Sequence, residues 1–176
     1  MGAVSENSEL HVFCDVSMKA YGGVAYARNV NGETCLLTAK LRIAPCKKHT
    51  LTTPRLEPMA LLVGARLAKY LSQNFKFSKV TIRGDSKVAV AWVGSKIENK
   101  STIIANRAWE VSFSLQECEF ELQHVSAKEN PADVLSREAD LKQLHENSLW
   151  AIDPAYCTSQ DPWQQLMTHE TMHLRQ

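Results

Sequence analysis

The sequence has no long apolar run, no closely spaced pair of cysteines and almost no net charge. Its apolar runs are short, such as the seven residues from Met59 to Ala65, whereas a helix that crosses a bilayer needs about 20. The first residues, MGAVSENSE, contain neither the basic nor the apolar segment of a secretory signal peptide. The sequence therefore predicts no membrane-spanning helix and no membrane partner.

The cysteines exclude two common classes of small protein. There are five of them, an odd number, and they are widely spaced without a C-x-x-C pair. A disulfide framework needs paired cysteines and a zinc knuckle needs closely spaced ones, so neither is expected. A reducing compartment is the simpler interpretation.

The net charge of +1 conceals a strong segregation along the chain. Residues 40–107 hold fourteen Lys and Arg against three acids, whereas residues 108–153 hold three against ten. A strongly basic segment predicts a face that binds a polyanion such as nucleic acid. The alternative is that these cations only solvate the exposed faces of helices.

Hydrophobic periodicity predicts alternating strands and helices. Three short strands are expected at 10–14, 22–28 and 35–41, with the hairpin signal Asn31-Gly32 between the last two. After a loop at 45–53, apolar residues recur at three- and four-residue steps, which predicts one long helix from about Leu56 to Leu71. Pro58 is harmless to this helix if it falls in the first turn.

The second half of the chain continues the pattern. A fourth strand is expected at 80–84, then a short helix capped by Ser86 and a longer one capped by Ser101. Alternation over 118–123 predicts a fifth strand, and Asn130-Pro131 opens a last helix. The order β-β-β-α-β-α-α-β-α predicts an α/β fold with a mixed sheet flanked by helices.

The same pattern divides the chain into three parts. Residues 10–138 are expected to form one domain, and residues 1–9 a disordered or expression-derived N-terminus. Residues 139–176 are expected to be an appendage that packs on the domain or links it onward, through apolar side chains at Trp150, Trp163 and Leu166.

Four carboxylates lie where such a fold places ligands. Asp15 and Asp85 close strands whose carboxyl ends border the ligand crevice of an α/β sheet. Glu57 and Asp133 are expected in the first turns of the long and last helices, where acids also serve simply to complement the helix dipole. If the four converge, their repulsion requires cations, and hard ions such as Mg²⁺ bind carboxylate oxygens and phosphate. Beside a basic segment, this pattern favours a metal-dependent nuclease.

Five segments, taken in order and spacing, resemble the ribonuclease H domain of BEL/Pao-type retrotransposon polyproteins, within the retroviral-type RNase H-like family. They are HVFCDVSMKAYGGVAYAR, LLTAKLRIAP, TTPRLEPMALLVGARLAKYL, VTIRGDSKVAVAWV and HVSAKENPADVLSR. The resemblance covers about residues 10–137. It implies an RNase H-like fold with a five-stranded mixed sheet of three antiparallel and two parallel strands.

The resemblance also implies an activity, which is metal-dependent cleavage of the RNA strand of RNA/DNA hybrids during retroelement reverse transcription. The family's four-acid site falls on Asp15, Glu57, Asp85 and Asp133. Asp15 is expected to bridge two Mg²⁺ ions, replaceable by Mn²⁺, with Glu57 and Asp85 on one ion and Asp133 on the other. The expected partners are the hybrid and a reverse transcriptase or another polyprotein domain. We expect the isolated domain to be a monomer in an intracellular setting, either a cytoplasmic particle or the nucleus.

His124 has two interpretations. The wider family places a histidine just after this strand, where it assists product release or relays a proton. Its alternation with Phe120 and Leu122 instead favours a buried strand residue. Candidate contacts to the nucleic acid are Ser17, Arg55, Ser86, Asn106, Lys47, Lys48, Lys96 and Lys100.

Two other functions remain open at this stage. One is a non-catalytic, host-adopted domain of the same fold that binds nucleic acid or a protein partner. The other is a DNA-cutting relative such as an integrase or resolvase, which fold alone does not separate from ribonuclease H.

Overall fold

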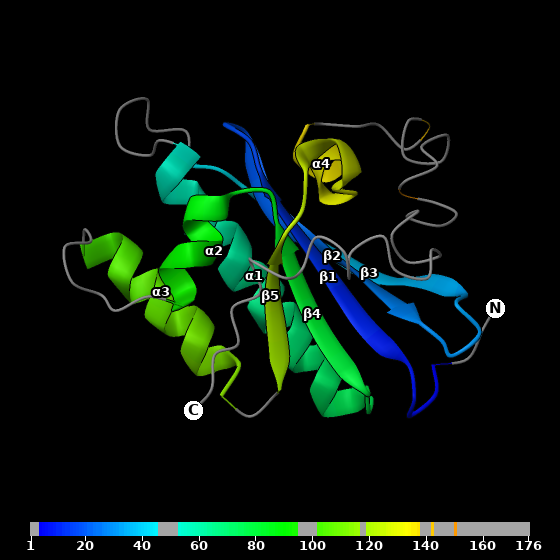
Figure 1. Cartoon of the computed structure of the whole chain (residues 1–176). Helices are drawn as coiled ribbons and strands as arrows, with labels where there is room; N and C mark the ends of the chain where they lie inside the picture. The colour runs from blue at the N-terminus through cyan, green and yellow to red at the C-terminus, as the bar shows by residue number, and fades with distance from the viewer. Residues whose placement is uncertain are drawn as a thin grey trace.

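The computed structural model describes residues 4–45, 53–94, 102–116, 119–137, 142 and 150. Five strands form one sheet in the order β3-β2-β1-β4-β5. β1 (Glu9–Val16), β2 (Ala20–Arg28) and β3 (Thr34–Ile43) are antiparallel neighbours, and β4 (Lys79–Gly84) and β5 (Phe120–His124) continue the sheet parallel to β1. The predicted α/β fold with a five-stranded mixed sheet is confirmed (Figure 1).

Helices cover both faces of the sheet. α1 (Thr53–Asn74), α2 (Lys87–Gly94) and α3 (Thr102–Ser114) lie on one side, and α4 (Ala132–Ser136) lies on the other, after the short 3₁₀ turn η1 (Ala127–Glu129) (Figure 1). The element order is the one predicted from periodicity. No helix within the described ranges is long and apolar enough to span a membrane.

Each face of the sheet has its own apolar core. The larger one joins alternate residues of β1, namely Leu10, Val12 and Cys14, to the inner face of α1. The smaller one contains Phe13, Val24, Tyr26, Val125 and Ala132. Asp15 lies on the same face of β1 as Phe13, because alternate residues of a strand share a face. The Asp15 side chain therefore starts, at the end of β1, on the side of the sheet that carries α4.

A glycine lets the long helix approach the sheet closely. A side chain at Gly64 would place its Cβ 2.2 Å from the Cys14 sulfur and 3.4 Å from Val12 Cγ1. Any larger residue would push α1 away from β1. Because α1 also carries Glu57, this contact helps to set the distance between Glu57 and Asp15.

The long helix begins earlier than predicted. α1 starts at Thr53, so Pro58 lies inside the helix and Glu57 lies beyond its first turn. The expectation that both fall in the first turn is wrong. The sequence signal for the earlier start is Thr53-Pro54, because proline is favoured in the first turn of a helix. Pro58 then has no N–H to donate to the Pro54 carbonyl.

Residues on both sides of the predicted domain contact it. Glu9 opens β1, and Ser8 is buried and accepts a backbone hydrogen bond from Ser78. The first strand thus starts one residue before its predicted domain boundary. Trp150 packs on the smaller core, and its carbonyl accepts a hydrogen bond from the Tyr26 hydroxyl. The described residues do not include Ser101, Cys118, Trp163 or Leu166.

Candidate active site

Two aspartates meet because β1 and β4 are parallel neighbours. Cys14 pairs with Gly84 across the two strands, and the next residues along the chain are Asp15 and Asp85. Both carboxyl groups therefore reach the same edge of the sheet. The strand ends predicted from the sequence thus bring this pair together.

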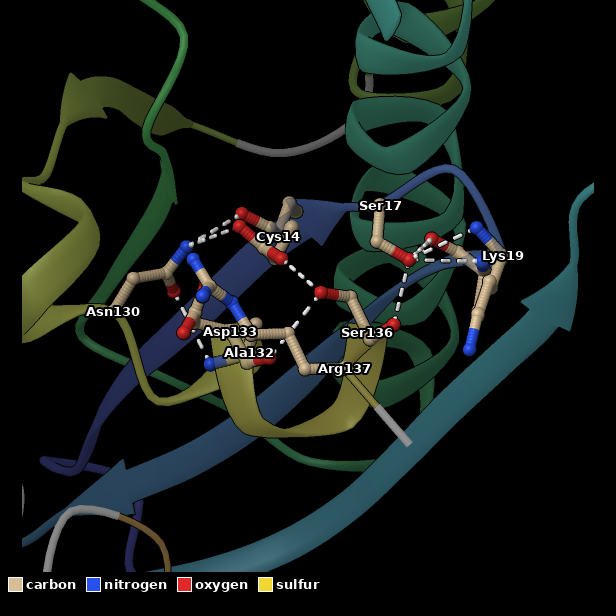
Figure 2. A network of polar contacts seen from close by, with 10 residues as sticks. Cys14, Ser17, Lys19, Asn130, Ala132, Asp133, Ser136 and Arg137 are labelled. Atoms are coloured by element: carbon tan, nitrogen blue, oxygen red, sulfur yellow. Dashed lines mark hydrogen bonds and ion pairs between the residues drawn. The ribbon is translucent and has the colours of Figure 1, made fainter. Parts of the chain in front are cut away.

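The Asp15 carboxyl is held by the segment around α4. Ser136 donates a hydrogen bond to Asp15 Oδ2. Asn130 Nδ2 donates to Asp15 Oδ1 at 3.3 Å and to the Cys14 carbonyl at 3.0 Å. Asn130 also accepts from the Ala132 amide through Oδ1, which fixes the start of α4 (Figure 2). One asparagine therefore couples the end of β1 to the start of α4.

The aspartate pair has perturbed acidity. Burial, together with the charges of Asp85 and Asp133, raises the pKa of Asp15 to about 7, against the opposing effect of the Ser136 hydrogen bond. Burial also raises the pKa of Asp85, while contacts with its own backbone, with Asp15 and with His124 act in the other direction. Carboxyl groups that share a site resist ionising together. A cation placed between them would offset this repulsion.

Glu57 reaches the same place from α1. A hollow between α1, α2 and the strand ends is lined by Asp15, Glu57 and Asp85. Ser86 donates to Glu57 Oε2 at 2.7 Å and accepts from the Ala89 amide at 3.1 Å. The predicted cap of α2 is therefore also the group that orients Glu57.

Asp133 approaches from the other face of the sheet. It lies in the first turn of α4, as predicted, and it raises the pKa of both Asp15 and Asp85. Its Oδ1 accepts from Arg137 Nε at 2.8 Å. Asp133 is thus close enough to act on the pair by charge, although it does not line the hollow.

The carboxylates of the candidate site are suitable ligands for a hard cation, but they are not close enough together to coordinate one in this arrangement. Carboxylate oxygens are the ligands that Mg²⁺ prefers. The raised pKa of Asp15 reflects first its burial and then the charges of Asp85 and Asp133, which a cation would offset. Within the part of the chain that is described, no three His, Cys, Asp or Glu side chains are close enough to hold one metal ion. For Asp15 Oδ2 to bind a metal ion, the carboxyl group would have to give up its hydrogen bond from Ser136.

His124 lies beside Asp85 and not in the core. It is the last residue of β5, pairs with Gly84 and is half-buried. Its Nε2 lies 3.0 Å from the Asp85 carbonyl oxygen. Nε2 donates in this contact if it carries the ring proton. The imidazole is thus within the candidate site, which the alternation with Phe120 did not predict.

The candidate contacts to nucleic acid have diverse surroundings. The Ser17 hydroxyl donates to the Ser136 carbonyl at 2.6 Å and accepts from the amides of Lys19 and Ala20 (Figure 2). It therefore ties the β1–β2 turn to α4. Asn106 is exposed on α3, and Arg55 lies in the first turn of α1. Four lysines lie outside the described residues, namely Lys47, Lys48, Lys96 and Lys100.

Part of the basic segment is engaged by acids of the chain itself. Several of its side chains pair with acids from other parts of the chain, in the contacts Arg66–Glu110, Lys76–Glu6, Lys79–Glu121 and Arg107–Glu110. Arg83 is buried against His11 and over the Phe13 ring. Segment charge alone therefore overstated the cations that are available to a ligand.

Sequence reasoning missed the residues that hold the carboxylates. Ser136 was not singled out, and Asn130 was recognised only as a helix cap, although both contact Asp15. A buried polar residue needs a partner, and the polar residues of the α4 segment were the available signal. Their partner lies more than 110 residues away in the sequence, so no local pattern identifies it.

Residues 3–86 match the family described as the Pao retrotransposon-like RNaseH-like domain. The chain is similar to the N-terminal RNase H domain of a Mycobacterium tuberculosis protein, with 15% identity, a TM-score of 0.53, and coverage of 70% of this chain and 86% of that one. It is also similar to LC11-RNase H1 solved in complex with an RNA/DNA hybrid, with 12% identity, a TM-score of 0.52, and coverage of 70% and 88%. No curated protein matches the chain. The match agrees with the resemblance over its first three motifs, and the chain has the RNase H-like fold that the five motifs implied, with residues 3–86 similar to the Pao retrotransposon-like RNaseH-like domain.

Proposed function

We propose that the chain is a metal-dependent endoribonuclease that cuts the RNA strand of RNA/DNA hybrids during retroelement reverse transcription. The observation that carries this proposal is the meeting of Asp15, Glu57 and Asp85 around one hollow at the strand ends. The nuclease fold and the retrotransposon family match support it. A domain that only binds a partner has no need for three clustered carboxylates at this position.

Asp15, Glu57, Asp85 and Asp133 would hold two Mg²⁺ ions, with Mn²⁺ able to substitute. When bound, the ions would activate the attacking water and stabilise the leaving 3′-oxygen. The chain's own residues prepare these ligands. Ser86 orients Glu57, and Ser136 and Asn130 hold the two oxygens of Asp15. His124, beside Asp85, would assist proton transfer or product release.

The proposed substrate class is based on the fold and on one similar structure. LC11-RNase H1 has been solved with an RNA/DNA hybrid, and we propose the same class of substrate here. Cations of the basic segment that are not engaged by internal acids would hold the phosphates of the two strands. The 2′-hydroxyl is the group by which such a site distinguishes RNA from DNA. A reverse transcriptase domain would be the natural neighbour in a polyprotein.

One observation favours the non-catalytic alternative. Asp15 is hydrogen-bonded through both oxygens, Arg137 pairs with Asp133, and no three ligands are drawn together within the described ranges. In a domain that does not bind metal, these hydrogen bonds would persist under all conditions. In an active nuclease, metal binding would replace them with bonds to the ion.

A cleavage assay on labelled RNA/DNA, RNA/RNA and DNA/DNA duplexes, with Mg²⁺ or with EDTA, tests the proposal. We expect the RNA strand of the hybrid alone to be cut, and only with Mg²⁺. Cleavage of DNA/DNA would favour the integrase or resolvase alternative. Hybrid binding without any cleavage would favour the non-catalytic domain.

A further inference from the structure

The outer edge of the sheet carries exposed apolar side chains. β3 ends the strand order and is ten residues long. Along it, Leu36, Leu41 and Ile43 are 43%, 44% and 81% exposed. None of the described residues pairs with its outer edge. A long edge strand of this kind is a template for pairing with another chain unless it is guarded.

A bulge places these apolar side chains on one face. The register shifts between Ala25 and Tyr26, so that Leu37 is an extra residue on β3. As a result Leu36 lies opposite Tyr26, Leu41 opposite Gly22, and Ile43 opposite Ala20. Cross-strand partners share a face, so the three side chains lie on the side of the sheet that carries α4 and Asp15.

The charges along β3 are arranged so that the strand complements itself. Glu33 immediately precedes the strand, and Lys40 and Arg42 lie near its end. All three are exposed, and none of the described acids forms an ion pair with Lys40 or Arg42. An antiparallel copy of the same strand would bring its negative end to the positive end of the first.

We propose that β3 is the interface of a homodimer, in which two copies pair antiparallel along this edge and join their sheets into one. Pairing centred on Ala39, with Leu37 bulged in each copy, places Leu36 of one copy opposite Leu41 of the other, and the reverse. Arg42 then lies diagonal to Glu33 of the second copy, within reach of a long side chain. This is the self-complementary arrangement that a two-fold axis requires.

The same charges explain why the edge does not pair indiscriminately. Lysine and arginine on an edge strand repel other basic edges and any parallel or shifted copy of β3. Only the antiparallel register sets them against an acid, so they select this partner and this register. Two such sheets continue in one plane, and both candidate sites then lie on the same side.

The proposed dimer departs from the monomer expected from the sequence, and it does not depend on the proposed nuclease activity. A single strand pair is a small interface, so we expect weak association with a dissociation constant on the order of 10 µM. Sedimentation velocity of the full chain from about 1 to about 200 µM measures it. A chain that stays monomeric throughout would overturn the proposal, whatever its activity.

Charge-reversal variants test the pairing itself. Glu33→Lys and Arg42→Glu each place like charges together in their own homodimer, so we expect each to weaken association by about tenfold or more. Mixed in equal amounts, the two variants form a heterodimer in which both contacts are attractive. The mixture should therefore regain dimers that neither variant forms alone, and damage within one chain could not produce this result. Lys128→Glu, on the exposed η1 turn, is the matched charge-reversal control. A wild-type dimer that the β3 variants leave unchanged, or a mixture that stays monomeric, would contradict pairing through β3.

Discussion

The Ser136 hydroxyl donates its hydrogen bond to Asp15 Oδ2 across 121 residues of sequence. It joins the last residue of α4 to the end of β1, so the short helix controls the carboxylate at the centre of the candidate site. This hydrogen bond lowers the pKa of Asp15. Burial and the neighbouring acids raise the pKa by more, so the net shift is upward. In the absence of metal, folding therefore favours the protonated form of the Asp15 carboxyl group.

The first prediction concerns stability and pH in the absence of metal. The pKa of Asp15 is about 7 in the folded chain and ordinarily 3.8, so the folded state binds the proton more tightly than the unfolded state. The contribution of Asp15 to stability is fully present below about pH 4 and is lost as pH rises through about 7. Asp15→Asn removes this loss. Its melting temperature relative to wild type should therefore rise between about pH 5 and pH 8 in EDTA.

Added Mg²⁺ should reverse the difference at high pH, because an ion that binds only the folded state stabilises it. Wild type should gain melting temperature with Mg²⁺, and Asp15→Asn should gain less. Glu129→Gln, an exposed acid on η1, is the control and should follow wild type. Identical pH curves for wild type and Asp15→Asn would show that Asp15 ionises normally.

The second prediction separates two roles of Ser86, which caps α2 and donates to Glu57. Ser86→Ala removes the cap and the hydrogen bond to Glu57. It should lower the free energy of unfolding by about 1 kcal/mol and also slow turnover. Ser86→Asp retains a cap for α2 but places a carboxylate against Glu57, so stability should recover while turnover stays low. Chemical denaturation and single-turnover rates measure the two effects. Full activity in Ser86→Asp would mean that the orientation of Glu57 is unimportant.

The third prediction concerns His124, whose Nε2 contacts the Asp85 carbonyl. Because the ring is half-buried at the end of β5, His124→Ala should leave melting nearly unchanged and slow turnover by about 10–100-fold. A packed core histidine would show the opposite result, with stability lower by about 1–3 kcal/mol and activity per folded molecule preserved. Thermal melts and single-turnover rates on this one variant distinguish them.

The fourth prediction concerns the salt dependence of hybrid binding. Each phosphate that the protein neutralises contributes about 0.9 to the slope of log affinity against log salt. Charge reversal at Lys47 and Lys48, or at Lys96 and Lys100, should therefore reduce this slope. Lys76→Glu is the control, because Lys76 already pairs with Glu6 and should not contribute. A flat salt response of wild type would favour a protein partner over nucleic acid.

The fold was predictable because its signals are local. The hairpin at Asn31-Gly32, where Gly32 has φ of +84°, and the alternation of strand residues each depend on neighbours within a few positions. The convergence of Asp15 and Asp85 was predictable as well, since parallel strands end at one edge. The start of α1 was misplaced because the Thr53-Pro54 signal was overlooked.

The residues that hold the site were not predictable in the same way. Asn130 and Ser136 find Asp15 only through the packing of α4 on the far face of the sheet. The pairing of Arg66 and Lys79 with distant acids likewise depends on tertiary contacts. Counting charges along the chain could not show which cations remain available.

The most direct test of the proposed function is the single-turnover cleavage rate of a 5′-labelled RNA/DNA hybrid by wild type and by Asp85→Asn, with saturating Mg²⁺. Asp85→Asn should fold, since it removes a charge that Asp15 and Asp133 oppose. We predict Mg²⁺-dependent cleavage by wild type and loss of at least about 100-fold in rate in the variant. Cleavage by Asp85→Asn at the wild-type rate would contradict the assignment of the site.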